Sequence, residues 1–439
     1  MSEVRQFHLS DNSILYHIST DIFKSSFFCV NFLYGGTWRD ARDVKLLFDV
    51  MSKGSVSYPT LMSVNRRLDD LYSTNLSALH SANHLSYFSG YGAEMLDARY
   101  ITDGTDVLSG ALEMINELTD KPLTDEEGRL SDHYIQLVLN EYMTRARNIY
   151  SVPKMKATER FYEKLAASND YYMTGKIYTK ADEVKDYDSD KFLSLLDVFR
   201  NRTKRVYGYL GTETPESVIS KIESNFSPAA RCDIAPFDEN VFSFDGVAPF
   251  EISETDPLAN QSQLIMGFLP SRHFDDNESE KVKMFSVIFG NSPSSRLFTR
   301  VREKMGLCYD ISSDFQVKGS LMTVDCGLAS VHIEKARGEI LKILEDMAKG
   351  DVTEDELTET RNLLKNDLLM VRDSPVSWLG FTIREALSGK NRAPEEVMEE
   401  LDRVTKEDIA QIAGAYVNRF NYTLLGKKNG EETGQLPTT

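Results

Sequence analysis

Side chains that could bind a metal ion are few and scattered in this sequence of 439 residues. Of the seven histidines, only His80 and His84 lie close together. They belong to the stretch LSALHSANHLSYF, whose pattern is typical of a β-hairpin. In a hairpin, a spacing of four does not place both rings on one helical face. We therefore expect a surface hairpin here and no metal site.

The cysteines offer no redox or zinc motif. None of the four, Cys29, Cys232, Cys308 and Cys326, forms a C-x-x-C pair, and three lie in apolar, strand-like runs. We expect buried free thiols in a reducing compartment. The patterns G-x-S-x-G, G-x-x-x-x-G-K-[ST] and G-x-G-x-x-G are absent from the sequence. Serine-hydrolase, P-loop and Rossmann interpretations therefore have no support.

The stretch from Gly36 to Leu71 resembles the zinc-binding region of the insulinase/pitrilysin peptidases, which include the mitochondrial processing peptidase. Active members of that family place H-x-x-E-H on a helix ahead of a K-G-T/S-like turn, and the turn is present as Lys53-Gly54-Ser55. In the active motif, two histidines one helical turn apart hold zinc and the Glu activates a zinc-bound water. A Glu from a later helix is the third ligand.

The matching helix of this sequence lacks the metal ligands. Leu46 and Val50 stand at the two histidine positions and Asp49 stands at the catalytic Glu position. Aliphatic side chains cannot bind a metal ion, and Glu141, near the third-ligand position, is one carboxylate alone. The resemblance therefore implies a degenerate site without zinc. We expect no cofactor here, and zinc only in an active partner chain.

A second segment, NSPSSRLFTRVREKMGLCYDISS, resembles the signature of the family's C-terminal domain. In active members, an Arg and a Tyr of this segment hold the substrate backbone. The resemblance assigns these roles to Arg302 and Tyr309, with Phe298 one helical turn before the Arg. Arg suits the role through its rigid fork of donors. The competing interpretation is an Arg that pairs with an acidic neighbour and a Tyr that packs in the core.

The elements that would position these residues occur twice along the chain. In each half, a strand is followed by two helices, two strands and a further helix; the first strands are FFCVNFLYGG and SQLIMGFLP. Each half then has a helix-start signal, Thr124 with Glu127 and Thr353 with Glu356. We predict an α+β fold of two homologous domains, each a mainly antiparallel sheet covered by helices. The expected division is a domain at 1–226, a linker at 227–240, a domain at 241–428 and a disordered tail at 429–439.

Composition and charge restrict the possible partners. A hydrophobic content of 41% with 27% charged residues is typical of a soluble globular protein. The net charge of −18 disfavours nucleic acid and anionic membranes. No apolar run approaches the roughly 20 residues that span a bilayer. The N-terminus lacks the features of a signal peptide, so we expect a cytoplasmic protein.

The resemblance implies a non-catalytic pseudo-peptidase subunit. Such a subunit would pair with an active paralogue, help to form a peptide-binding chamber, and bind peptide or unfolded polypeptide. Two alternatives remain. One is a self-sufficient peptide-binding or structural homodimer, and the other is an active metallopeptidase with a relocated metal site.

Overall fold

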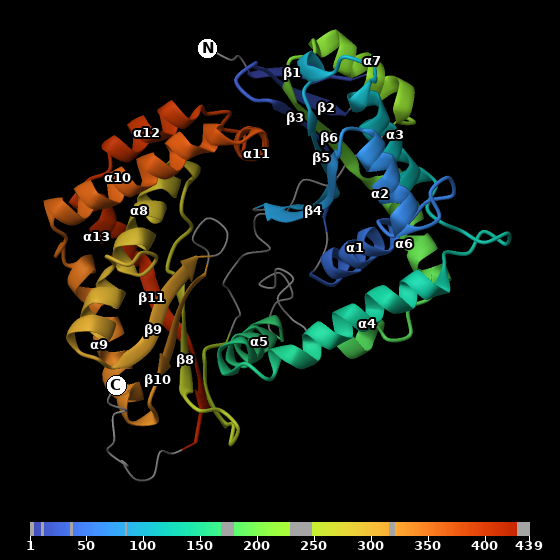
Figure 1. Ribbon diagram of the computed structural model, residues 1–439. Coiled ribbons are helices and arrows are strands. Elements are labelled where there is room, and N and C mark those ends of the chain that lie inside the picture. Colours follow the sequence, from blue (N-terminus) through green and yellow to red (C-terminus); the bar gives the residue numbers. More distant parts are fainter. Residues whose placement is uncertain are drawn as a thin grey trace, which may run out of the picture. The chain divides into compact units, whose positions relative to one another are not determined.

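The computed structural model describes residues 4–9, 13–35, 38–83, 86–167, 180–228, 248–315 and 321–427, and these cluster in two compact units (Figure 1). Unit 1 takes its described residues from Met1–Arg145, Met173–Ser243 and Asp367–Glu396. Unit 2 takes its described residues from Ala146–Tyr172, Phe244–Asn366 and Val397–Thr439. Each unit contains one β-sheet with helices packed on it.

Unit 1 is built on a six-stranded sheet of order β1-β2-β6-β3-β5-β4, in which only the β2–β6 pair is parallel. The strands are β1 (Val4–His8), β2 (Ile14–Ser19), β3 (Ser25–Tyr34), β4 (Asn75–Asn83), β5 (Ser86–Leu96) and β6 (Lys204–Gly211). Side chains of β3 alternate between two hydrophobic clusters, one on each face of the sheet. The larger cluster includes residues of α1 (Trp38–Met51), α2 (Leu61–Asp70), α3 (Val107–Asp120), α4 (Asp132–Ile149), α6 (Ser189–Arg202) and α7 (Pro215–Asn225).

Unit 2 repeats this topology without the extra first strand. Its sheet has the order β7-β11-β8-β10-β9, and the strands are β7 (Phe250–Thr255), β8 (Ser262–Pro270), β9 (Cys308–Phe315), β10 (Met322–Leu328) and β11 (Tyr416–Leu425). This order matches β2-β6-β3-β5-β4 strand for strand, so the predicted α+β fold of two similar sheets is confirmed. Helices of the second half are α8 (Ser279–Phe289), α9 (Ile333–Ala348), α10 (Glu354–Met370), α11 (Pro375–Leu387), α12 (Pro394–Asp402) and α13 (Lys406–Ala415).

The two halves of the chain exchange one helix each. Helix α5 (Pro153–Ala166), from the first half, packs on β8 and β11 of unit 2. Helix α11, from the second half, packs on β2, β3 and β6 of unit 1. It approaches β6 so closely that a Cβ on Gly208 would lie 2.8 Å from the Leu379 side chain. The units therefore differ from the expected contiguous domains, because periodicity reveals a helix but not the sheet that it covers. Most of the expected linker and all of the expected tail lie outside the described residues.

One of the two predicted helix starts is correct. Thr353 and Glu356 form the reciprocal cap at the start of α10, with the Glu356 amide donating to Thr353 Oγ1 at 3.1 Å. The start predicted at Thr124 is wrong, and α4 begins only at Asp132. The Asp125 carboxylate instead accepts the amides of Glu127 and Arg129 at 3.0 and 2.9 Å and stabilises a turn. A short acidic side chain can offer the backbone this alternative to a helix.

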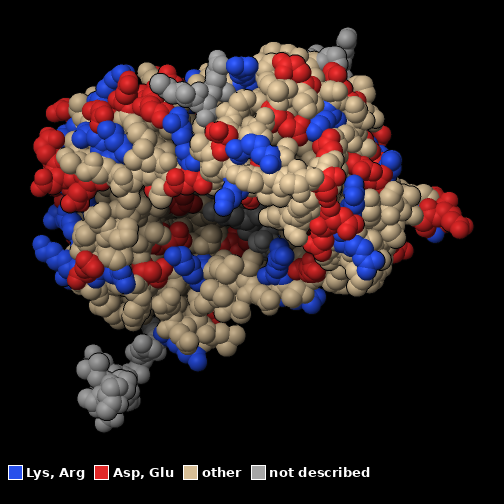
Figure 2. All heavy atoms as spheres, turned by 45° about the horizontal axis from the view of Figure 1, so that its top comes forward, with Lys and Arg blue, Asp and Glu red and all other residues tan. Residues whose placement is uncertain are grey.

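Charged side chains of both signs are mixed on the surface. On the face shown in Figure 2, Asp and Glu are spread among Lys and Arg rather than separated from them. Within the described part of the chain, no helix is both long and apolar enough to cross a lipid bilayer.

A degenerate metal-binding helix and a substrate-binding candidate

On helix α1, the two positions that were matched to the family's metal-binding histidines face the hydrophobic core. The side chains of Leu46 and Val50 are only 2% and 5% exposed and pack in the larger cluster of unit 1. Lys45 and Asp49 lie on a different face, where Lys45 Nζ is 2.7 Å from Asp49 Oδ2 and the side chains are 44% and 33% exposed. The accessible face of α1 thus holds an ammonium–carboxylate pair with the i, i+4 spacing.

This geometry corrects the predicted positions. A hydrolytic metal site must admit water and a peptide, and the buried positions Leu46 and Val50 admit neither. The i, i+4 pair that could hold a metal ion on this helix is Lys45 and Asp49, one residue earlier. Phe48, not Asp49, then takes the intervening position, and it is fully buried. Sequence reasoning missed Lys45, although the alternation of apolar and charged residues along α1 could have identified the accessible face.

His80 lies beside this pair, on edge strand β4. Its ring is 5.6 Å from that of Phe48, and its Nδ1 is 3.0 Å from Ser89 Oγ. Burial first, and then the Lys45 ammonium, lower the pKa of His80 to about 4, so the ring is neutral at pH 7. Its Nε2 is buried without a hydrogen-bond partner. The β4–β5 hairpin is as predicted, but His80 is half-buried against α1 instead of on the surface, and His84 lies outside the described residues.

Glu141 does not complete a metal site. Its side chain is 48% exposed, and its closest cation is Lys53, with Nζ 3.9 Å from the carboxylate. The core-facing side of α4 is formed by Ile135, Val138 and Leu139. The Asp49 and Glu141 carboxylates therefore each lie next to a lysine ammonium group. Nowhere in the described ranges do three His, Cys, Asp or Glu side chains gather to hold a metal ion. These residues do not fit a zinc ion.

The second candidate site lies on the π-helix Leu297–Lys304 of unit 2. Arg296, just before it, is buried and donates to Glu356 at 2.6 and 2.8 Å. Arg300 is likewise paired with two acids, Glu339 and Asp346. Arg302 differs from both. It is exposed, its guanidinium carbon lies 4.4 Å above the centre of the Phe298 ring, and it has no acidic partner in the part of the chain that the structure describes.

Tyr309 is also presented to solvent. It lies on β9, an edge strand of the unit 2 sheet, and is 65% exposed. A hydrogen bond from Cys326 holds the pKa of the neighbouring Cys308 thiol below its ordinary value, and the Arg302 cation adds a smaller lowering effect. The described geometry thus supports neither the paired Arg nor the core Tyr of the competing interpretation. A role for Phe298, Arg302 and Tyr309 in binding substrate stays a prediction.

The cysteine prediction holds for part of the chain. Cys29 and Cys326 are buried free thiols, whereas Cys308 is a half-buried free thiol. Cys232 lies outside the described residues.

The sequence of this chain is similar to those of known proteins that are described as inactive peptidases. Residues 208–364 match the family model "Peptidase M16 inactive domain". The chain is 23% identical over 429 residues to the "Probable inactive metalloprotease YmfF" of Bacillus subtilis (strain 168), covering 97% of this chain and 99% of that one. The similarity is therefore to the M16 peptidase family. This is the insulinase/pitrilysin family whose motifs the sequence resembles.

Solved structures show the same fold. A conserved protein from Enterococcus faecalis V583 superposes with a TM-score of 0.86 at 20% identity, covering 98% of this chain and all of that one. An M16 inactive domain from Pseudomonas fluorescens superposes with a TM-score of 0.73 at 15% identity, covering 99% and 100%. Three of the matched descriptions contain the word "inactive". They agree with the expectation from the sequence that this chain does not catalyse the family's reaction.

Replacing the accessible pair tests which face of α1 corresponds to the M16 metal site. We expect Lys45→His with Asp49→His to change the free energy of unfolding by less than about 1 kcal/mol, because an exposed i, i+4 ion pair contributes only about 0.3–0.5 kcal/mol. The two imidazoles would then share the accessible face, near the unpartnered Nε2 of His80. Zinc retention, measured by competition with a chromogenic chelator, should rise above that of the wild type. A folded variant that retains no zinc would contradict this assignment.

Proposed function

We propose that this chain is a non-catalytic pseudo-peptidase subunit that pairs with an active M16 paralogue and contributes to a peptide-binding chamber. The observation that most supports this is the contrast between the two candidate sites. The accessible face of α1 holds Lys45 and Asp49 in place of metal ligands, whereas Arg302 and Tyr309 stay exposed on unit 2. Such a chain has the groups to hold a peptide but not those to cut it.

The exposed groups suit a peptide backbone. A guanidinium that stacks on Phe298 is held in place while its N–H groups remain available to carbonyl oxygens. The Tyr309 hydroxyl can add a further hydrogen bond. Strands β4 and β9 are sheet edges, and the open edge of a sheet can accept an extended segment through its main chain. Binding of this kind depends little on sequence, as recruitment of unfolded polypeptide would require.

The decisive experiment is affinity purification of the full-length chain from its native cell, with identification of the co-eluting proteins. We expect a stoichiometric partner that contains H-x-x-E-H and binds zinc. Light scattering should then give the mass of a heterodimer when the two chains are mixed. A stable homodimer that an active paralogue leaves unchanged would refute the pairing, and so would stoichiometric zinc with peptidase activity in the isolated chain.

A substitution on the π-helix tests the peptide contact. We expect Arg302→Ala to weaken binding of an unfolded polypeptide, such as a reduced and carboxymethylated protein, at least about tenfold, because hydrogen bonds to a charged group contribute about 1.5–3 kcal/mol. Fluorescence anisotropy of a labelled polypeptide measures this. The melting temperature should stay within about 2 °C, since Arg302 has no acidic partner among the described residues. A lower melting temperature with unchanged affinity would show a structural Arg.

A further inference from the structure

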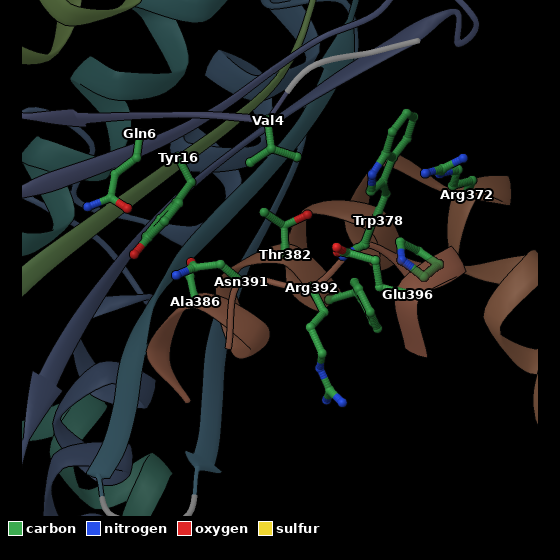
Figure 3. A pocket seen from close by; sticks show the side chains of 13 residues that line it. Val4, Gln6, Tyr16, Arg372, Trp378, Thr382, Ala386, Asn391, Arg392 and Glu396 are labelled. Atoms are coloured by element: carbon green, nitrogen blue, oxygen red, sulfur yellow. The ribbon is translucent and has the colours of Figure 1, made fainter. Parts of the chain in front are cut away.

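Unit 1 contains a cavity of about 410 Å³ at the sheet edge opposite to β4 (Figure 3). One wall is formed by Val4 and Gln6 of β1 and Tyr16 of β2, and Gln6 and Tyr16 are directly paired in the sheet. The other wall is α11 with the loop that follows it. The degenerate site on α1 lies near β4 and β5, at the other edge of the sheet, so the cavity is not part of that site.

The cavity exists because α11 covers the sheet incompletely. Trp378, Leu379 and Ile383 of this helix pack against side chains of β2, β3 and β6 in the smaller hydrophobic cluster. Strand β1 extends the sheet by one strand, and its residues are mostly exposed. The side chains of Val4 and Gln6 thus lie on the same face of the sheet that α11 covers, but beyond the end of that helix's contact with the sheet.

The loop after α11 is held in a defined conformation. Gly389 and Asn391 both adopt positive φ angles, of 75° and 51°. Arg392 then donates to Glu385 on α11 at 2.8 Å, and both side chains are largely buried. This clamp holds the loop against the helix, so that Asn391 is a fixed part of the cavity wall. The site is therefore built by specific contacts and is not a chance gap between loops.

Polar groups face the cavity without protein partners. Tyr16 is only 5% exposed, yet its hydroxyl makes no hydrogen bond to any described residue. The side chains of Thr382 and Asn391 likewise have none within the described ranges. In Figure 3 the polar ends of Gln6, Tyr16 and Asn391 lie toward one end of the cavity and Trp378 toward the other. The Tyr16 hydroxyl is therefore available to a ligand that carries a hydrogen-bonding group.

The lining selects a neutral aromatic ligand. Three aromatic side chains, Tyr16, Trp378 and Phe381, surround the space. The two arginines of the lining are already occupied, because Arg372 pairs with Glu395 at 2.6 Å and Arg392 pairs with Glu385. An anionic ligand would therefore have to compete with existing ion pairs. The volume lies in the range of roughly 300–1,000 Å³ that is usual for ligand pockets.

We propose that this cavity is an anchoring site for one aromatic side chain of an extended polypeptide, whose main chain runs along the open edge of β1. The aromatic ring packs against Trp378 and Phe381, and the adjoining amides bond to Tyr16 and Asn391. Among the described strands, β1 pairs only with β2, so its outer main chain can pair with such a segment. The choice of polypeptide as the ligand rests on the proposed function, whereas the site itself does not.

The test uses N-acetyl-L-phenylalaninamide, which combines one aromatic ring with two amides. The sequence has two tryptophans, Trp38 and Trp378. In the full-length Trp38→Phe variant, the fluorescence of Trp378 reports on the cavity alone, and we expect a saturable change on adding the probe. Tyr16→Phe should weaken binding about three- to tenfold through the loss of one hydrogen bond. Ala386→Phe, which fills the cavity, should weaken it more than tenfold. N-acetyl-L-alaninamide should bind at least tenfold more weakly than the phenylalanine probe.

A matched control is Tyr100→Phe, since Tyr100 is 46% exposed and does not line the cavity; it should leave the affinity unchanged. Absence of saturable binding would overturn the proposal. Binding that both Tyr16→Phe and Ala386→Phe leave unchanged would overturn it too. Reduced, carboxymethylated α-lactalbumin should displace the probe, and failure to do so would overturn the polypeptide assignment. These measurements need no paralogue, so their failure is distinct from failure to co-purify an active M16 chain.

Discussion

Placing histidines at positions 46 and 50 should unfold unit 1 instead of creating a zinc site. Leu46 and Val50 are almost fully buried in the larger cluster, among residues such as Leu47 and Met51. Each substitution removes aliphatic packing and buries a polar ring without a partner, at a cost of about 3–5 kcal/mol per site. Since whole domains are stable by only about 5–15 kcal/mol, we expect Leu46→His with Val50→His to abolish the cooperative unfolding transition of this unit.

Circular dichroism with chemical denaturation measures this loss, and atomic absorption after dialysis measures bound zinc. The control is Lys45→His with Asp49→His, which places the same two side chains on the accessible face. The accessible-face variant should remain folded and the buried-face variant should not. If the buried-face variant folded and held zinc, the assignment of the degenerate site to Lys45 and Asp49 would be wrong.

The second large effect concerns Arg296. Its guanidinium donates to Glu356 at 2.6 and 2.8 Å and to Asp351 at 3.2 Å, with only 9% of its side chain exposed. Removing one member of a buried pair leaves the other charge uncompensated, at a cost of about 3–5 kcal/mol. The Glu356 side chain is 27% exposed, so solvent screens part of this cost. We expect Arg296→Ala to lower the free energy of unfolding by about 2–3 kcal/mol.

The pH dependence of this effect has a definite sign. Burial, the largest single cause, raises the pKa of Glu356, but the hydrogen bond and charge of Arg296 and the hydrogen bonds from Thr353 together outweigh it, and the net pKa lies below the ordinary value of 4.5. A depressed folded-state pKa stabilises the fold above the ordinary value and loses that effect as the pH falls through the folded-state value. The stability difference between wild type and Arg296→Ala should therefore be largest near pH 7 and shrink below about pH 4. A difference that is constant with pH would show that packing, not charge, is responsible.

The variant Arg302→Ala provides a contrast to Arg296→Ala, because it changes a nearby arginine in the same segment. Arg296 and Arg302 lie six residues apart in one basic segment, and the sequence alone does not distinguish their roles. The structure separates a buried, acid-paired arginine from an exposed one that stacks on Phe298. Stability should change for Arg296 and polypeptide affinity for Arg302.

The repeat could be predicted from sequence because each half contains the same order of strongly periodic strands and helices. The two sheets confirm it, strand for strand. The metal-ligand positions predicted at Leu46 and Val50 each lie one residue after the accessible pair Lys45 and Asp49. The resemblance of the Gly36–Leu71 stretch to the family's zinc-binding region assigned Leu46 and Val50, and the packing shows that both point inward.

Other errors have a related physical origin. His80 was expected on the surface because a hairpin pattern does not show which helix packs against it. The start predicted at Thr124 failed because Asp125, the next residue, accepts two backbone amides of its own turn. Each of these errors arises because a side chain makes a contact that the pattern of polar and apolar residues in the sequence does not indicate. The cavity beside β1 is of the same kind, since its walls come from residues 4–16 and 372–396.

The exchange of α5 and α11 has a consequence for how this chain can be divided. Phe161 of α5 is fully buried, with its ring 5.7 Å from that of Phe250, and Trp378 and Leu379 of α11 are buried against the other sheet. If the chain were cut between its halves, the first fragment would lack α11, which covers the unit 1 sheet, and the second would lack α5, which covers the unit 2 sheet. Each fragment would also carry a helix whose sheet is in the other fragment. Neither fragment should be soluble by itself. When the two fragments are co-expressed, they should assemble, because each supplies the helix that the other one lacks. The two halves of the chain therefore have to be made together in order to fold.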